Sequence, residues 1–385
     1  MDLTVERRDL RDAVRRLLAK TVTAEALPDA AGLGSGTAGR PPWRRLCDEI
    51  GVAGLAIPER YGGAGAGLAE VCVVIEELGR NLTPASMLGS AVLAVQAVLA
   101  TGDDAACARL LPAIADGSAI AALAWTTAAG HWDTSEVAFE ARPVGVGAGG
   151  GGAAGGDGAG GSGGDWELTG EAHYVLDGEA ADVLLAVART PDDIGLFEVS
   201  PGQDGVARAA VTTMDESRSL AVVRLTGACG RRIGGDAAGP LAFARDQACI
   251  ALGAEQVGAA QGALELTVAH LLTRVQFGQV IGGFQALQHR AADLYVLVES
   301  ARSLARAAAS AAPDPDCELR AAAVKVYCSE ALTRTAGEMI QLHGAIGVTW
   351  EHRAHRYLKR AHGGRYLFGS PDRHLATIAA SLIDR

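Results

Sequence analysis

Apolar residues in the first part of the chain recur at the spacing of helices. They stand three or four positions apart, which places them on one helix face, as at Leu10, Val14, Leu17 and Leu18. The same spacing marks three further stretches, residues 43–50, 67–80 and 87–100. Pro58 and the glycines that follow it predict a fixed loop over 57–65. Residues 1–117 are therefore predicted to form an N-terminal helical domain.

The pattern changes after Gly117. Short runs of strand-forming residues, separated by turns, cover residues 119–127, 167–169, 183–188, 195–199 and 221–225. A tract rich in glycine and alanine over 144–164 is predicted to be a mobile loop between two strands, because glycine loses the most backbone entropy on ordering. The tract lacks the Lys-Ser/Thr pair of a phosphate-binding P-loop. Residues 118–236 are predicted to form a β-barrel or β-sandwich domain.

Helical spacing returns near residue 240. One helix face carries the stripe Val257, Gln261, Leu264, Val268 and Leu271. Two more helices are predicted over 284–312 and 316–342, separated by the prolines of 313–315 and with Asp316 as a cap. Ser370 and the proline after it open a last helix. Residues 237–385 are predicted to form a four-helix bundle, which completes an α+β fold.

Composition and charge narrow the function. The net charge of -11 argues against a nucleic-acid partner, whose phosphates require basic surfaces. No apolar run reaches the roughly 18 to 20 residues of a membrane span, and the N-terminus carries acidic residues and lacks the apolar core of a signal peptide. The seven cysteines form no C-x-x-C pair and the histidines no H-x-x-x-H spacing. We therefore expect a cytoplasmic protein with free thiols and no metal site.

Motifs in four places, in the same order as in a known family, carry a resemblance. They are Ala53–Gly65 (with Pro58-Glu59-Arg60-Tyr61-Gly62-Gly63), Glu76–Arg80, Arg274–Gly278 followed by Phe284-Gln285, and Gln341–Gly347. They resemble the motifs of the acyl-CoA dehydrogenase family, whose members have helices, a β middle domain and a helical bundle. The resemblance implies FAD as the cofactor, α,β-desaturation of an acyl-CoA as the reaction, and an electron-transfer flavoprotein as the electron acceptor.

The segment 274–278 has the chemistry of a dinucleotide site. The planar guanidinium of Arg274 can form charge-assisted hydrogen bonds to a pyrophosphate, and Gln276 can add a neutral donor. Phe277 offers an aromatic face, and Gly278 lets a backbone approach closely. In the family these residues reach across a subunit interface to the neighbour's FAD. The resemblance assigns further contacts with that cofactor to Gln285, Gln341 and Gly344, whereas Ala345 departs from the family's second glycine.

The catalytic base is where the sequence departs from the family. Removing a proton alpha to a thioester carbonyl requires a general base, usually a carboxylate with a raised pKa. In many members this is the Glu of a Y-E-G-T turn, whose place Phe368 takes here. In another branch it lies on the first long helix of the bundle, at the position of Ala248. Asp246 and Asp372 remain as weak candidates, although two residues from Ala248 is about 200° around a helix.

The segments that would hold the chain's own flavin also differ from the family. Its T-E-P-x-x-G-S-D run corresponds to residues 125–133, and its W-x-T segment to residues 174–178. Thr126 and Thr127 are the nearest candidates for hydroxyls that hydrogen-bond to the flavin, or they are simply strand residues. The chain thus keeps the residues that serve a neighbour's cofactor, while its own base and flavin cradle look lost.

Three hypotheses follow. The first is a base-lacking subunit paired with a complementary chain, as in actinobacterial α2β2 acyl-CoA dehydrogenases, to which the segment 349–361 is similar. The second is a self-sufficient homo-oligomeric dehydrogenase that uses Asp246 or Asp372 as the base. The third is a scaffold protein that has this fold without redox chemistry. The motifs do not specify the acyl group.

Overall fold

The structure is a computed structural model that describes residues 3–21, 41–144, 166–311 and 316–383. The predicted loop over 144–164 and the predicted break at 313–315 lie outside the described residues, except for Val144. In the described part of the chain, no helix combines the length and the apolar character that crossing a membrane requires.

The N-terminal region is helical, as predicted. Its helices are α1 (Val5–Thr21), α2 (Pro41–Ile50), α3 (Leu68–Arg80), a π-helical segment (Met87–Ala94) that continues into α4 (Val95–Ala100), and α5 (Asp104–Ala115). The loop over 57–65 is fixed by backbone hydrogen bonds, including Gly65 N–H to the Ile57 carbonyl at 2.9 Å. Gly63 is required there, because a Cβ atom would lie 2.0 Å from the Ile57 oxygen.

The middle region is a seven-stranded sheet that closes on itself. Its strands are β1 (Ala121–Ala124), β2 (Phe139–Pro143), β3 (Trp166–Leu176), β4 (Val183–Arg189), β5 (Ile194–Val199), β6 (Val206–Ala210) and β7 (Leu220–Ile233). The order is β1-β4-β2-β3-β7-β5, and β5 also pairs with β4, so the sheet forms a barrel. A buried apolar cluster that includes Phe139, Leu168 and Phe197 fills its interior.

Several predicted strand boundaries were wrong. The run 119–127 contains a strand only at 121–124, and the runs 167–169 and 221–225 are parts of the much longer β3 and β7. The strands β2 and β6 were not predicted. Phe139 and Ala141 of β2 face the barrel interior, whereas β6 is partly or fully exposed along its length.

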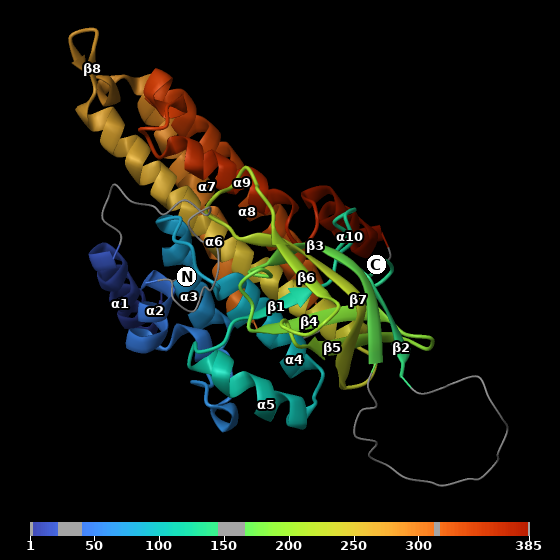
Figure 1. The fold of residues 1–385 in the computed structure, drawn as a ribbon. Helices are drawn as coiled ribbons and strands as arrows, with labels where there is room; N and C mark the ends of the chain where they lie inside the picture. Colours follow the sequence, from blue (N-terminus) through green and yellow to red (C-terminus); the bar gives the residue numbers. More distant parts are fainter. Residues whose placement is uncertain (1–2, 22–40, 145–165, 312–315, 384–385) are drawn as a thin grey trace, which may run out of the picture.

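The C-terminal region is a bundle around one long buried helix. Its elements are α6 (Ala238–Thr273), the hairpin strands β8 (Val275–Gln276) and β9 (Gln279–Val280), α7 (Gln285–Ser310), α8 (Cys317–His343), α9 (Ala354–Tyr366) and α10 (Pro371–Ile383). Figure 1 shows α6, α7 and α8 side by side, with the β8–β9 hairpin at the end far from the sheet. Helix α3 packs closely on α6, since a Cβ atom at Gly258 would lie 1.8 Å from the Glu76 oxygen. The helix α9 was not predicted.

Candidate cofactor-binding site

The predicted pyrophosphate-binding residues lie on a hairpin that extends from the end of α6. Phe277 and Gly278 form its turn with φ angles of 54° and 81°, the left-handed conformation that a type I′ hairpin turn needs at both positions. Phe277 is 91% exposed, and Arg274 and Gln276 are also exposed. The hairpin therefore presents its cation, amide and aromatic ring to solvent, and the edge-on approach of the Phe277 ring to Phe284, at 6.3 Å, leaves most of that ring exposed.

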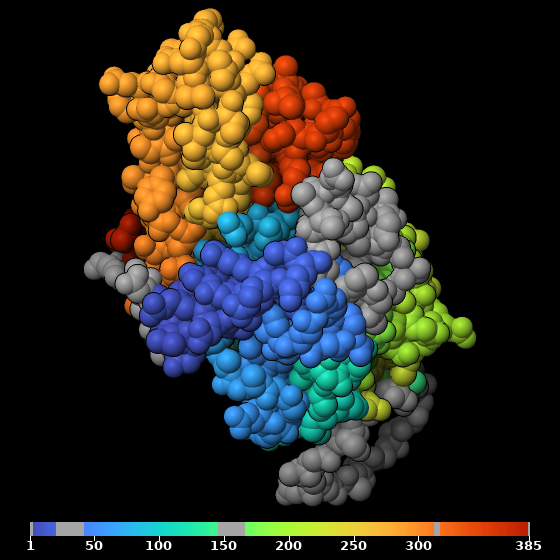
Figure 2. Space-filling view, turned by 90° about the vertical axis from the view of Figure 1, so that its left-hand side faces the viewer, coloured from blue at the N-terminus to red at the C-terminus, as the bar shows by residue number. Residues whose placement is uncertain are grey.

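The other predicted contacts lie at the same end of the bundle. Gln285 begins α7, Gln341 lies in the last turn of α8, and Gly344 follows that helix with a φ of 63°. All three are exposed. The ends of α6 and α8 are adjacent, because the rings of His270 and His343 lie 4.4 Å apart. We call Arg274, Gln276, Phe277, Gln285, Gln341 and Gly344 the clamp; Figure 2 shows its two segments, gold-orange and red-orange, projecting beyond the N-terminal helices.

The clamp is remote from the β domain of its own chain. That domain contacts the first part of α6, where Arg245 donates to the Trp132 carbonyl at 3.4 Å. At 1.5 Å per residue, a helix needs about 44 Å to run from Arg245 to the position of Arg274. The structure therefore does not bring the clamp together with Thr126 and Thr127.

The two candidate flavin-binding hydroxyls are engaged within the chain. Thr126 is completely buried, and its hydroxyl donates to the His173 carbonyl at 2.9 Å. The Thr127 hydroxyl donates to Glu136 at 2.8 Å. Neither residue lies in a strand, because β1 ends at Ala124. Both of these hydroxyl protons are therefore already donated inside the molecule.

Aromatic side chains pack against Phe368. This residue follows α9 in a left-handed conformation, with a φ of 62° and 1% exposure. Its ring meets that of Trp132 edge-on at 4.9 Å, and Trp132 meets Trp125 in the same manner at 5.9 Å. Where the resemblance would place a carboxylate, the chain has three contacting rings and no proton acceptor on Phe368.

The alternative positions for a base have different environments. Ala248 is completely buried in α6. Asp246 is 6% exposed, and its Oδ1 accepts two hydrogen bonds from Arg245, at 2.8 and 3.0 Å. Burial raises the pKa of Asp246, although Arg245 opposes that effect. Asp372 is exposed in the first turn of α10, the usual place of an acidic residue that favours a helix N-terminus.

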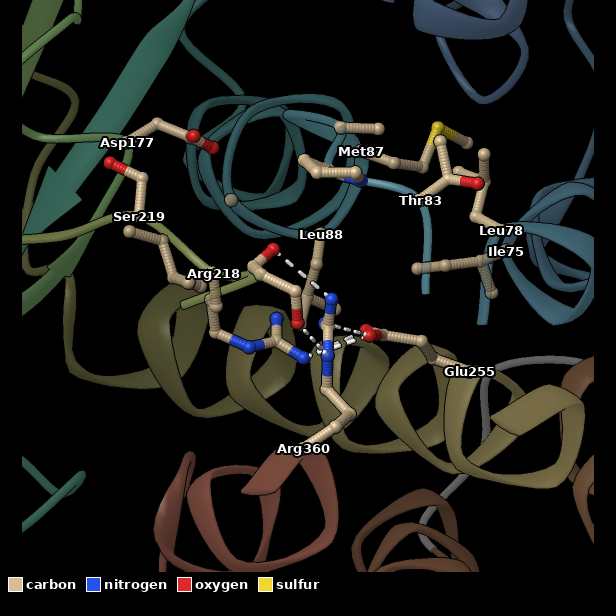
Figure 3. Close-up of a pocket in the computed structure, with 15 residues that line it drawn as sticks. Ile75, Leu78, Thr83, Met87, Leu88, Asp177, Arg218, Ser219, Glu255 and Arg360 are labelled. Carbon is tan, nitrogen blue, oxygen red and sulfur yellow. Dashed lines mark hydrogen bonds and ion pairs between the residues drawn. The ribbon is translucent and has the colours of Figure 1, made fainter. Parts of the chain in front are cut away.

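A buried ionic cluster joins the β domain to the bundle, and the sequence analysis did not identify it. Figure 3 shows Arg218 and Arg360 converging on Glu255 of α6. Arg218 lies 2.8 Å from Glu255 Oε1, Arg360 contacts the same oxygen, and Arg360 Nε lies 3.2 Å from Asp215. All four side chains are at most 9% exposed. Burial raises the pKa of Asp215, but Arg360 and Arg218 outweigh it, so that the pKa is lowered.

The cavity beside this cluster is small. It has a volume of about 30 Å³ and is also lined by the apolar residues Ile75, Leu78 and Leu88 (Figure 3). Ligand pockets for small molecules are roughly 300 to 1,000 Å³. The cavity can hold water but not an acyl group. No spacing in the sequence marks its charged residues, because they come from a loop, the middle of α6 and α9.

Comparisons with known proteins identify the family. The model of the acyl-CoA dehydrogenase N-terminal domain matches residues 4–118, and that of the C-terminal domain matches residues 244–383. The chain is 36% identical over 369 residues to acyl-CoA dehydrogenase IpdE2 of Mycobacterium tuberculosis, covering 95% of this chain and 94% of that protein. The chain belongs to the acyl-CoA dehydrogenase family. Members of this family are flavoprotein oxidoreductases that act on acyl-CoA.

Solved structures of similar proteins have the same fold. A chain of the ChsE4–ChsE5 complex from Mycobacterium tuberculosis matches with a TM-score of 0.83, 26% identity and full coverage of both chains. A variant of the Tcur3481–Tcur3483 steroid ACAD matches with a TM-score of 0.81 and 27% identity over 98% of each chain. The predicted family and the predicted α+β fold of an acyl-CoA dehydrogenase are thereby confirmed.

Proposed function

We propose that this chain is a base-lacking subunit of an FAD-dependent acyl-CoA dehydrogenase and provides its clamp to a complementary partner subunit. The observation that carries the proposal is the contrast between the two halves of the site. The clamp is exposed at one end of the bundle, whereas Phe368 is sealed against Trp132. The partner provides the carboxylate and the pocket for acyl-CoA.

The clamp fits the charged half of FAD. Arg274 and Gln276 are exposed on a hairpin, and Phe277 adds an exposed ring. A guanidinium matches the pyrophosphate in charge and geometry. Bound there, FAD would accept the hydride that leaves the beta carbon of the substrate, and this chain's residues would only hold and orient it.

The chain's own flavin cradle does not fit the cofactor. The hydroxyls of Thr126 and Thr127 donate within the chain, and the rings of Trp132 and Phe368 pack against each other at the expected position of the base. Placing a polar flavin edge between these edge-on rings would separate buried apolar surfaces. We infer that catalysis takes place on the partner.

The relatives support a partner that is an unlike chain. The ChsE4–ChsE5 complex and the Tcur3481–Tcur3483 steroid ACAD each carry the names of two different chains. A steroid acyl-CoA is accordingly the substrate class that we propose, with an electron-transfer flavoprotein as the electron acceptor.

Purification with and without a partner tests the proposal. The chain would be co-expressed with an acyl-CoA dehydrogenase that has a Glu at the base position and is encoded beside it. The pair is expected to retain FAD and to desaturate acyl-CoA, whereas the single chain does neither. Stoichiometric FAD and robust turnover from the single chain would refute the proposal. A pair that binds no FAD, and therefore remains colourless, would favour the hypothesis that the chain is a scaffold protein without redox chemistry.

A variant of the clamp sharpens this test. Arg274→Ala removes charge-assisted hydrogen bonds worth about 1.5–3 kcal/mol, so the pair's affinity for FAD should fall roughly 10- to 150-fold. Arg142→Ala is the matched control, because Arg142 is also an exposed arginine, with its side chain 82% exposed, and lies in the β domain. Equal FAD affinities of the two variants would contradict a role for Arg274.

A self-sufficient homo-oligomer with Asp246 as the base is the second candidate. The raised pKa of this buried carboxylate favours it. In that case Asp246→Asn would abolish the turnover of the single chain without loss of FAD. Retained turnover in this variant would exclude Asp246 as the base.

A further inference from the structure

Three imidazole rings are stacked beneath the clamp. His270 comes from the last turn of α6, His343 from the last residue of α8, and His352 from the loop before α9. The ring centroids of His270 and His343 lie 4.4 Å apart at 26°, and those of His343 and His352 lie 4.4 Å apart at 43°. We call these three residues the histidine stack.

The histidine stack connects the two halves of the clamp. His270 lies one helical turn before Arg274, on the segment that resembles the family's pyrophosphate contact. His343 lies between Gln341 and Gly344, which resemble the adenosine contacts. The rings are therefore a direct contact between the two segments that would hold one cofactor.

Hydrogen bonds define the neutral form of two of the rings. His343 is 6% exposed, and its Nδ1 lies 2.7 Å from the Met339 carbonyl, so Nδ1 carries the proton. Its Nε2 is buried and has no hydrogen-bond partner in the described part of the chain. The Nδ1 atom of His352 accepts from the Ala354 backbone N–H at 3.2 Å, which requires Nδ1 to be unprotonated. A further proton on His343 would be a buried charge without an acceptor.

The surroundings of the histidine stack oppose protonation of its rings. Burial is the largest cause that lowers the pKa of each ring, and the hydrogen bond to the Met339 carbonyl only partly offsets it at His343. His343 and Arg274 lower the pKa of His270 further, and His343, His270, Arg353 and His355 lower that of His352. Within the described residues, none of the three rings forms an ion pair with a carboxylate. Each proton added would thus place a cation beside other cations.

We propose that the histidine stack positions the Arg274 hairpin relative to the Gln341–Gly344 turn, and that it does so only while its rings are neutral. The three histidines are positioning residues that do not touch the cofactor. The proposal rests on the proposed function in one respect, namely that both segments contact the same FAD. It adds a pH dependence to the clamp that the family resemblance does not imply.

The direction of this pH dependence follows from the lowered pKa values. In the unfolded chain the histidines bind protons below about pH 6.5, whereas in the folded chain their lowered pKa values delay protonation to lower pH. The neutral histidine stack is therefore stable above about pH 6.5 and is lost as the pH falls through the lowered pKa values. FAD retention by the pair should therefore weaken as the pH falls from 7.5 to 5.5.

The single chain allows the first test without any cofactor. Backbone amide shifts of Gly278 and Gly344 report on the two halves of the clamp and can be followed by NMR from pH 8 to pH 5. Both glycines are expected to shift with one common midpoint. His343→Phe keeps an aromatic ring in the stack but cannot titrate, so this common transition should disappear. Independent midpoints, or an unchanged transition in His343→Phe, would overturn the proposal.

The pair provides the second test, through release of FAD followed by flavin fluorescence at the two pH values. The wild-type pair should lose affinity at pH 5.5, His343→Phe should lose much less, and His131→Phe should behave as wild type. His131 is a matched control because it is half exposed and lies in the β domain. Coupled glycine shifts in a chain whose pair binds no FAD would refute the proposed function alone. FAD binding with equal pH dependence in wild type and His343→Phe would refute the histidine stack alone.

Discussion

Replacing Arg360 by methionine tests whether the buried ionic cluster holds the β domain on the bundle. The side chain is 6% exposed, and it contacts Glu255 and lies 3.2 Å from Asp215. It also donates to the Ser217 hydroxyl and carbonyl, both at 3.1 Å. Methionine preserves most of the volume but removes every one of these interactions.

The loss of unfolding free energy in Arg360→Met follows from the two carboxylates, Asp215 and Glu255, that remain buried. In Arg360→Met, Asp215 keeps its hydrogen bond from the Ser217 backbone N–H at 3.1 Å but loses the adjacent cation. Glu255 retains Arg218. Removing one partner of a buried ion pair costs about 3–5 kcal/mol, a large part of the roughly 5–15 kcal/mol that stabilises a domain. Exposed pairs cost less than about 1 kcal/mol, so Arg224→Met, whose side chain is 64% exposed beside Glu171, is the control.

Urea unfolding at several pH values measures this effect. The pKa of Asp215 is lowered in the folded chain, so its contribution is present above the unfolded pKa of about 3.9 and is lost as the pH falls through the folded pKa. Arg360→Met should lack this loss at acidic pH and should unfold at much lower urea at pH 7. Equal unfolding free energies of the Arg360 and Arg224 variants would show that the cluster is effectively hydrated, which would refute the reasoning.

Two further predictions concern buried polar positions. Phe368→Glu should destabilise the chain by several kcal/mol, because a carboxylate would be buried against Trp132. Phe368→Glu should also fail to restore acyl-CoA-dependent reduction of a dye by the single chain. Turnover by this single-chain variant would contradict the proposal that the chain's own flavin cradle is closed. Burial lowers the pKa of Lys325 to about 8, so the unfolding free energy should rise from pH 8 towards pH 10.5 by about 3 kcal/mol. In urea unfolding, Lys325→Met should lack that rise. An identical pH dependence of the unfolding free energy in wild type and Lys325→Met would disprove the prediction.

The sequence predicted elements whose signal is local and strong. Helix spacing located α1, α3, α6, α7 and α8 because their buried faces repeat with the period of a helix. The helix α9 was missed because Gly363-Gly364 interrupts its helical pattern, although Gly364 is buried there beside the Gln256 side chain. The strand β6 was missed because three of its five residues are alanines, which have weak β propensity. Long-range contacts, rather than local preference, decide both elements, since Gly364 of α9 packs beside Gln256 and β6 pairs with β7.

The candidate site shows the same difference between local motifs and long-range contacts. The clamp residues could be named from the sequence because they occur in short motifs. The partners of Glu255 lie 37 and 105 residues away, at Arg218 and Arg360, so no local pattern joins them. The sequence could place Phe368 at the expected position of the base, but its contact with Trp132 depends on two segments more than 200 residues apart. In the proposed function, that contact closes the chain's own flavin cradle.

The proposed closure of this cradle has a consequence for cofactor stoichiometry. If clamp and cradle lie on different chains, a homo-oligomer with both intact binds one FAD per chain. In the proposed function, this chain presents an exposed clamp, whereas the contact of Trp132 with Phe368 closes its cradle. A clamp of the partner subunit that faces this chain would therefore have no FAD to bind. The purified pair should contain one FAD for each two chains, measured as flavin absorbance against protein concentration. One FAD per chain would mean that the aromatic contact opens on assembly and that the single-site arrangement is wrong.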